Sequence, residues 1–190
     1  MLVICGLGNP GKRYENTRHN VGFKLIDSIL KKYNFEILKK NKSNEIYKGK
    51  IKTTECCLLK PLTYMNLSGS PIGKFLHYYK ISKKNFIVVH DDLDLELGKI
   101  KVKMGGGNGG HNGLASIDEA IGNSYNRLRI GIGHPGSKEL VNQYVLAKFD
   151  TNEKKIINKL IKLTVEHIHL LFFNKQLFLN KISPLFRKII

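Results

Sequence analysis

Residues 2–11 read LVICGLGNPG, a continuous apolar run that passes into a turn rich in glycine. An uninterrupted apolar run bounded by turn residues is typical of a buried strand. The glycines and Pro10 end such a strand and turn the chain sharply. This stretch therefore predicts that the chain begins with a strand in the core, and that polar residues follow where the strand leaves it.

The same string satisfies the fingerprint G-x-G-x-x-G, so binding of a dinucleotide has to be weighed. The glycines of that fingerprint open directly onto a helix, whereas polar and charged residues fill positions 12–18 here. The strand expected near residues 35–38 ends in Lys39 and Lys40, where a nicotinamide enzyme would place an acidic residue to hold a ribose. A nicotinamide enzyme is the weaker alternative, although a basic strand end could suit a 2′-phosphate.

A polar cluster, NTRHN at residues 16–20, lies between the glycine-rich turn and a helical pattern that starts at Val21. Asn20 is well suited to be the N-cap of that helix. His19 would then lie just outside the helix N-terminus, where the helix dipole disfavours imidazolium and helps to keep the ring neutral and able to accept a proton. A histidine in such a place is more often incidental than catalytic, so position alone assigns it no role.

Charge indicates a polyanionic partner. The 190 residues contain 32 Lys and Arg against 15 Asp and Glu, for a formal net charge of +17. A compact fold with so much like charge repels itself, and nucleic acid is the first candidate for a compensating partner. Paired lysines such as Lys31 and Lys32 can equally serve solubility alone.

Length and cysteine content favour one cytoplasmic domain. We expect residues 1–190 to form a single domain, with a C-terminal helix and tail from about residue 151. The three cysteines lie in apolar runs and indicate neither a disulfide framework nor a zinc site. The N-terminus lacks a charged leader, and no apolar run approaches the roughly 20 residues of a spanning helix, so we expect a soluble protein without a membrane partner.

The middle of the chain predicts two neighbouring antiparallel strands at residues 45–51 and 55–59. Pro61 ends the second strand, and a loop with Tyr64, Met65 and Asn66 follows before a helical stretch that runs to residue 79. The aromatic ring and the thioether could be core residues, but the amide beside them suggests a binding wall.

Three carboxylates follow the buried strand expected at residues 85–89. Asp91, Asp92 and Asp94 would lie at the carboxyl end of that strand, where open α/β sheets bind ligands. They could form a metal site, or one could be functional while the others are structural. We favour the second interpretation, because hard-cation sites gather ligands from several elements and this chain is poor in acids.

Residues 99–103 alternate strictly, which places three lysines on one face of a strand, and a glycine-rich run follows at 104–113 with six glycines in ten residues. Such a run loses much conformational entropy on folding, so it indicates close backbone approach to a ligand or a moving gate. A helix is expected at 114–121, with Asn112 near its N-cap. Later patterns predict a strand at 126–133 that carries two arginines on one face, helices at 140–146 and 153–173, and a basic, apolar tail at 175–190.

Six strings in this order resemble the signature set of bacterial peptidyl-tRNA hydrolase: GLGNPG, TRHNVG, PLTYMNLSG, HDDLDL, GGGNGGHNGL and RLRIGIGHPG. The resemblance implies a single α/β domain with a twisted mixed β-sheet flanked by helices, acting in translation and ribosome rescue as a monomer without cofactor or metal. The implied reaction is hydrolysis of the ester between a peptide, or an N-blocked aminoacyl group, and the 3′-terminal ribose of tRNA.

The resemblance also implies roles for individual residues. His19 matches the catalytic base that activates water, Asp91 the carboxylate that orients it, and Asn9 the residue that recognises the N-blocked group. The other matching positions contact peptide or tRNA, including its acceptor stem and CCA end: Tyr14, Tyr64, Met65, Asn66, Asn112, Lys101, Lys103 and Arg129. A noncatalytic RNA-binding protein and a metal-dependent hydrolase built on Asp91, Asp92 and Asp94 are the remaining alternatives.

Overall fold

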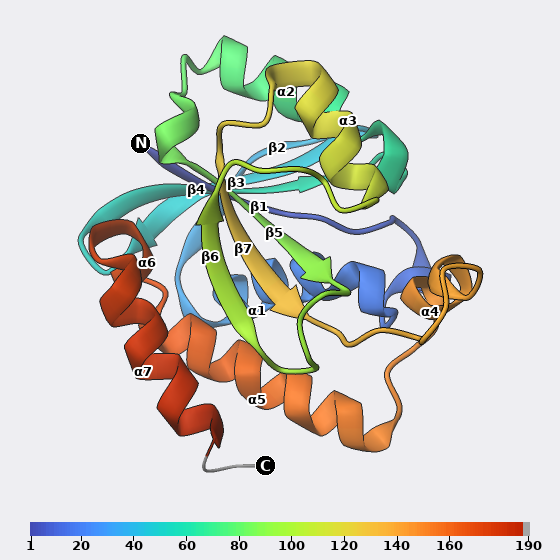
Figure 1. Ribbon diagram of the computed structural model, residues 1–190. Coiled ribbons are helices and arrows are strands. Elements are labelled where there is room, and N and C mark those ends of the chain that lie inside the picture. Colours follow the sequence, from blue (N-terminus) through green and yellow to red (C-terminus); the bar gives the residue numbers. More distant parts are fainter. Residues whose placement is uncertain (188–190) are drawn as a thin grey trace.

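The computed structural model describes residues 1–187, and it contains one seven-stranded mixed β-sheet with helices on both faces (Figure 1). The strands are β1 Leu2–Gly6, β2 Phe35–Lys40, β3 Asn44–Ile51, β4 Thr54–Pro61, β5 Phe86–Asp92, β6 Ile100–Met104 and β7 Asn126–Gly131. The α-helices are α1 Val21–Lys32, α2 Gly69–Tyr78, α3 Asn112–Ile121, α4 Val141–Leu146, α5 Thr151–His167, α6 Leu170–Phe173 and α7 Lys175–Arg187. Short 3₁₀ helices include η1 Lys12–Tyr14, η2 Arg18–Asn20 and η3 Met65–Leu67.

The strand order is β2-β3-β4-β1-β5-β7-β6. The four central strands β4, β1, β5 and β7 are parallel, while β2, β3 and β6 pair in antiparallel fashion. Central parallel strands are covered on both faces, which explains the unbroken apolar runs of β1 and β5. The α/β class and the mixed sheet flanked by helices, both expected from the sequence, are confirmed.

Two apolar cores separate the sheet from its helical layers. One contains side chains of α1, α5 and α7 against one face of the sheet, and the other contains side chains of α2 and α3 against the opposite face. Figure 1 shows α2 and α3 above the sheet and α1 and α5 below it. Alternate residues of β1 feed the two cores: Ile4 belongs to the first, and Val3 and Cys5 to the second. The two layers leave the carboxyl ends of the central strands as the place for a site.

Close contact between α1 and β1 depends on glycine. A Cβ atom on Gly22 would lie 2.4 Å from the backbone N of Leu7, 2.5 Å from its O and 2.5 Å from the backbone O of Val89. A Cβ on Gly6 would lie 2.3 Å from the backbone O of Gly22. These glycines let α1 begin directly against the ends of β1 and β5, which fixes where the preceding η2 segment lies.

The C-terminal region differs from its prediction. The helix expected over 153–173 is broken between α5 and α6, and α7 folds back against α5. This reversal buries Phe178 and Ile182 in the same core as α1 and α5, whereas a straight extension would leave both in solvent. The tail expected at 175–190 is therefore helical through residue 187, and its last three residues lie outside the described part of the chain. Within residues 1–187, none of the helices has the length and apolar character needed to cross a bilayer.

Candidate active site

A cavity of about 660 Å³ opens at the carboxyl ends of β5 and β7. The glycine-rich loop before α3 and the N-terminus of α3 form one side of it, and α4 forms another. Its lining includes His19, Asp91, His111, Asn112 and Arg129. The cavity thus brings together segments that are widely separated in the sequence.

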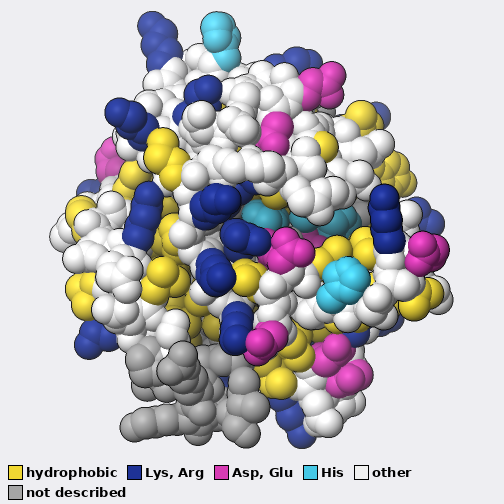
Figure 2. Space-filling model, in the orientation of Figure 1, with side chains coloured by type: hydrophobic (Ala, Val, Ile, Leu, Met, Phe, Trp, Pro, Cys, Tyr) yellow, Lys and Arg dark blue, Asp and Glu magenta, His cyan; other side chains and the backbone are white. Residues whose placement is uncertain are grey.

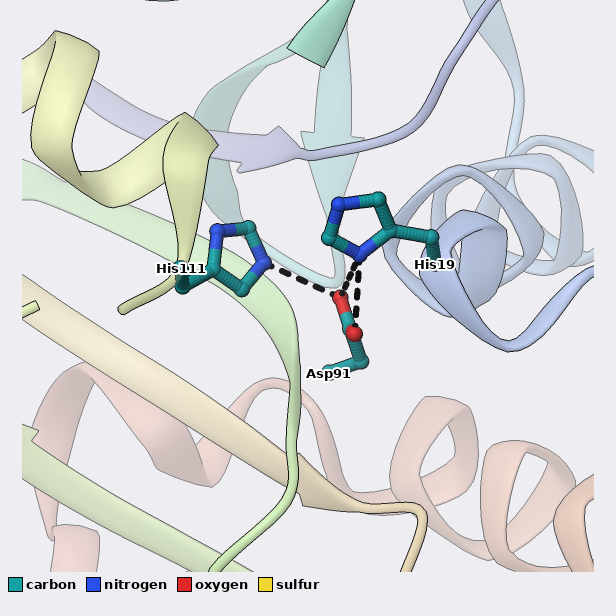
Figure 3. A group of neighbouring side chains, drawn as sticks. All are labelled: His19, Asp91 and His111. Carbon is teal, nitrogen blue, oxygen red and sulfur yellow. Dashed lines mark hydrogen bonds and ion pairs between the residues drawn. The ribbon is translucent and has the colours of Figure 1, made fainter. Parts of the chain in front are cut away.

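His19 and Asp91 meet at the base of this cavity. Asp91 is the second-last residue of β5 and His19 lies in η2, and both side chains are almost completely buried. His19 Nδ1 lies 3.0 Å from Asp91 Oδ1 and 2.9 Å from Oδ2. A carboxylate accepts at both oxygens, so Nδ1 carries the hydrogen and Nε2 holds the lone pair. Figure 3 shows Nε2 directed away from Asp91.

His111 is a second histidine on the same carboxylate (Figure 3), and the sequence analysis did not single it out. His111 Nε2 lies 3.0 Å from Asp91 Oδ1, and Nδ1 accepts hydrogen bonds from the backbone N–H groups of Gly113 and Leu114 at 3.1 and 3.3 Å. His111 is therefore the N-cap of α3, and Asn112, which was expected near the N-cap, is the first helical residue. Because Nδ1 accepts, Nε2 must carry the hydrogen that Asp91 receives.

Ionisation in this group follows from burial and mutual charge. Burial lowers the pKa of His19, but the negative charge of Asp91 and its hydrogen bond outweigh burial and raise that pKa above its ordinary value of 6.5. Burial raises the pKa of Asp91, but the two imidazoles outweigh burial and hold that pKa well below its usual range. The sequence argument expected the helix dipole to keep this ring neutral, whereas Asp91 raises the pKa of His19.

His90 is a third histidine beside the pair, and it stays neutral. Burial and the neighbouring His111 lower the pKa of His90 to about 3. Its Nδ1 lies 2.7 Å from the backbone O of Asp91, and its ring meets the His111 ring edge to face at 5.2 Å between centroids. His90 therefore supports the base of the site without adding charge.

Asn9 is held by Asn20, the residue that follows His19, and it does not itself line the cavity. The backbone N–H of Asn9 donates to Asn20 Oδ1 at 2.8 Å, and Asn20 Nδ2 donates to the backbone O of Asn9 at 2.9 Å. The Asn20 side chain therefore hydrogen-bonds to Asn9 and makes no capping hydrogen bond to α1, contrary to expectation. Asn9 Oδ1 accepts from the backbone N–H of Met65 at 2.8 Å, which leaves the two hydrogens of Nδ2 for another partner.

The loop that carries Tyr64, Met65 and Asn66 adjoins the site without lining the cavity. Met65 is buried, and a Cβ on Gly113 would lie 2.5 Å from its Sδ and 3.0 Å from His111 Cε1, so the thioether packs next to the capping histidine. Asn66 is exposed, and Tyr64 is 53% exposed. The Tyr64 ring stands edge to face with that of Tyr14, with 6.5 Å between centroids.

Basic side chains of β6 and β7 contribute to the cavity and its surroundings. Lys103 and Arg129 line it, while Lys101 is exposed on β6 and pairs in register with Arg129. Figure 2 shows Lys and Arg side chains grouped beside histidines on this face. Arg129 Nε donates to Asp92 Oδ2, so part of its charge is already balanced within the protein.

The carboxylates of the HDDLD stretch serve different partners. Asp91 accepts from two histidines, Asp92 pairs with Arg129, and Asp94 is an exposed residue 3.9 Å from the same guanidinium. Within residues 1–187, His19, Asp91 and His111 are the only group of three or more His, Cys, Asp or Glu side chains that lie close enough to hold a metal ion, with one ligand atom of each within 4.8 Å of the others. Both nitrogens that face Asp91 carry hydrogens, so this group fits a hydrogen-bonded triad and not a cation site.

The glycine-rich loop is anchored at one end. Arg127 Nη1 donates to the backbone O of Gly107 at 2.7 Å, and Nη2 donates to that of Gly106 at 2.9 Å and to Asp118 at 3.0 Å. Beyond this anchor, Gly109 and Gly110 have φ angles of +59° and +77°, which side-chain-bearing residues rarely adopt. Glycine is therefore required at these positions by backbone conformation, and the same loop also lines the cavity.

Comparison with known proteins gives a consistent family. The family model described as peptidyl-tRNA hydrolase matches residues 3–186. A peptidyl-tRNA hydrolase of Bartonella henselae is 49% identical over 184 residues, covering 96% of this chain and 95% of that protein, and one of Rickettsia canadensis is 47% identical over 185 residues, covering 96% and 100%. The crystal structure of peptidyl-tRNA hydrolase from Acinetobacter baumannii superposes with a TM-score of 0.89 at 40% identity, covering 96% of this chain and 94% of that one.

Proposed function

Because this chain belongs to the peptidyl-tRNA hydrolase family, we propose that it hydrolyses the ester between a peptide, or an N-blocked aminoacyl group, and the 3′-terminal ribose of tRNA. The observation that carries the mechanism is the contact of His19 with Asp91 in a cavity large enough for the reacting end of such a substrate. The products are free tRNA and a peptide with a free carboxylate.

His19 is the general base of this mechanism. Nε2 takes a proton from water while the oxygen of that water attacks the ester carbonyl. Asp91 keeps the hydrogen on Nδ1 and stabilises the imidazolium that forms, because a fixed negative charge lies 2.9 Å from Nδ1. When the tetrahedral intermediate breaks, the same Nε2 returns the proton to the departing ribose oxygen. Acid and base roles alternate on one nitrogen, and no net proton is consumed in the two steps.

Amide donors surround the reacting carbonyl in this proposal. Asn9 Oδ1 is already bound to Met65, which leaves Nδ2 as its donor, and Asn112 lines the cavity from the first turn of α3. Each amide offers a donor to a carbonyl and an acceptor to a peptide N–H. Asn9 then binds the N-blocked end, and Asn66 supports the peptide from the neighbouring loop. Simple aminoacyl-tRNA lacks the acyl carbonyl of the N-blocked end, so it would leave the Asn9 donor unpaired, and this selects against it.

The tRNA is bound along two surfaces. The exposed ring of Tyr64 and its partner Tyr14 suit stacking with bases of the CCA end. Lys101, Lys103 and Arg129 suit the phosphates of the acceptor stem and give affinity without sequence readout. Residues 1–190 act as one cytoplasmic, monomeric domain in this proposal, with no cofactor or metal.

Replacing His19 with Ala tests the central claim. Hydrolysis of N-acetyl-aminoacyl-tRNA should fall ~10²- to 10⁴-fold, the usual contribution of general-base catalysis. Binding of uncharged tRNA, measured by filter retention, should persist. His77→Ala, on the exposed side of α2, is the matched control and should keep full activity. A His19→Ala variant that remains active would refute the mechanism.

The alternatives predict other results. A noncatalytic RNA-binding protein binds tRNA and hydrolyses nothing, whatever residue stands at position 19. A metal-dependent hydrolase loses activity in EDTA, whereas the mechanism proposed here does not. A nicotinamide enzyme shows a thermal shift with NAD(P), but η1 and η2 stand between β1 and α1, where the dinucleotide fingerprint requires a direct strand-to-helix turn.

A further inference from the structure

Arg18 immediately precedes His19, but its side chain does not line the cavity. The guanidinium is about nine-tenths buried under the connection between α4 and α5. Nη1 donates to the backbone O of Tyr144 at 3.3 Å and to that of Lys148 at 3.1 Å, and Nη2 donates to Glu153 Oε2 at 2.6 Å. The backbone N–H of Arg18 donates to the O of Ala147 at 3.0 Å. One residue therefore closes four hydrogen bonds on a segment about 130 positions later in the chain.

The partners of Arg18 are themselves fixed. Glu153 Oε2 also accepts from the backbone N–H of Asp150 at 2.8 Å, as part of a capping box that begins the 17-residue helix α5. The guanidinium carbon lies 4.1 Å from the centroid of the Tyr144 ring, whose hydroxyl donates to the backbone O of Ile132 at 2.6 Å. Arg18 is therefore connected to helix α5 through Glu153, and to the segment that follows β7 through Tyr144.

Arg18 binds helix α4, and this helix forms a wall of the cavity. Val141, Asn142 and Val145 of α4 line the cavity, and Arg18 bonds to the carbonyl of Tyr144 in the last turn of this helix. His19 follows Arg18 in the chain and lines the same cavity. The Arg18 side chain thus connects the segment that carries His19 to the α4 wall through contacts that lie outside the cavity.

We propose that Arg18 is a positioning residue that holds His19 and the α4 wall in register through the α4–α5 connection. This inference rests on the proposed role of His19 as the base. A buried ion pair is seldom the most stabilising way to fill a space, and an apolar side chain of similar volume often stabilises as well. Here Nε of Arg18 is buried without a hydrogen-bond partner among the described residues, so burial of the guanidinium costs stability that a purely structural contact need not cost. The planar guanidinium does supply a fixed geometry, since one group binds two carbonyls and one carboxylate.

A defect in positioning has a distinct kinetic signature. Misplacing a catalytic group by about 1 Å can cost ~10²-fold in rate. Because Arg18 does not contact the substrate, its loss should lower kcat while KM changes little. The hydrogen bond between His19 and Asp91 should loosen at the same time, which imidazole N–H resonances of ¹⁵N-histidine-labelled protein report directly.

Arg18→Met, Arg18→Lys and Glu153→Gln are the test variants, and Ile161→Val on the buried side of α5 is the control for lost stability. With N-acetyl-aminoacyl-tRNA as substrate, Arg18→Met should lower kcat 10- to 100-fold with KM within threefold, and the His19 N–H resonance should broaden. Arg18→Lys, which keeps the charge but not the fork, should recover part of kcat. Glu153→Gln, which keeps an acceptor for the capping box, should fall between Arg18→Lys and the native enzyme.

Two results would overturn the proposal. One is a kcat for Arg18→Met within threefold of that for Ile161→Val at a temperature where both are folded. The other is an unchanged His19 resonance together with a rise in KM alone, which would make Arg18 part of substrate binding. If Arg18→Met does not fold, Arg18→Lys and Glu153→Gln decide by the same criteria. Activity that survives in His19→Ala would instead refute the proposed function, so the two failures are distinguishable.

Discussion

His19 Nδ1 lies 2.9 Å from Asp91 Oδ2, and the other ring nitrogen points away from this carboxylate (Figure 3). The His19 side chain lines the cavity. The carboxylate has two effects that act together. It fixes the tautomer that leaves the lone pair on Nε2, and it raises the pKa of the ring despite burial. The same charge that makes Nε2 a stronger base also sets the pH below which the base is lost.

The acid limb of the pH–rate profile follows from this pairing. The base works only when neutral, so kcat/KM should rise with pH through the pKa of His19. Because that pKa is raised from 6.5, the midpoint of the limb should lie above pH 6.5. Measuring kcat/KM with N-acetyl-aminoacyl-tRNA between pH 5 and 9 checks this, and a midpoint at or below 6.5 would contradict the assignment.

Asp91→Asn should move the limb and lower the rate. An uncharged amide no longer opposes burial, so the pKa of His19 should fall and the acid limb should shift to lower pH. The amide also no longer stabilises the imidazolium, and we expect kcat to fall ~10²- to 10⁴-fold, as for loss of the base itself. A lower kcat without a shift of the limb would mean that Asp91 acts only on substrate.

His111 combines two jobs that substitution can separate. His111→Asn should retain the cap of α3, since Asn is a favoured N-cap, but it is too short to reach Asp91. Thermal stability should then stay close to native, while kcat falls about tenfold for the loss of one hydrogen bond of about 1–1.5 kcal/mol. His111→Ala should lose the cap as well, at a further cost of about 0.5–2 kcal/mol in unfolding free energy. Equal stability of the two variants would disprove the capping role.

Sequence reasoning went furthest where a local pattern has one physical meaning. The apolar runs of β1 and β5 identified buried strands, and alternation identified β3 and β6. The contact of His19 with Asp91 joins positions 72 apart, and no periodicity predicts it; the family resemblance did. His111 was missed because its value depends on how α3 approaches the end of β5. Arg18 was missed because its partners lie in the α4–α5 connection, whose path only tertiary packing decides.

Salt dependence tests the phosphate contacts on β6. Each released counterion contributes about 0.9 to the slope of log affinity against log salt, so Lys103→Ala should lower kcat/KM at low salt and flatten the slope by about 1. Lys39→Ala, on the opposite edge strand β2, is the matched control and should leave the slope unchanged. Arg129 is already paired with Asp92, and its replacement should flatten the slope less than that of Lys103. Identical slopes for native protein and Lys103→Ala would argue against a phosphate contact there.

Gly22→Ala tests the packing that places the site. The three atoms nearest to the added Cβ would all be backbone atoms, of Leu7 and Val89, at 2.4–2.5 Å, and backbone cannot move aside as a flexible side chain can. Overpacking of this kind costs about 1–3 kcal/mol, so Tm should fall by several degrees for a chain of this size.

Gly73→Ala, in α2, is the matched control: its Cβ would lie 3.5 Å from Ile121 Cγ2, an ordinary contact. Alanine there should stabilise by about 0.5–1 kcal/mol, because glycine is the poorer helix former. Thermal melts of both variants should therefore shift in opposite directions, and a neutral Gly22→Ala would show that α1 can slide on β1 without cost. Because η2 precedes α1 directly, a destabilised Gly22→Ala should also lose kcat through displacement of His19.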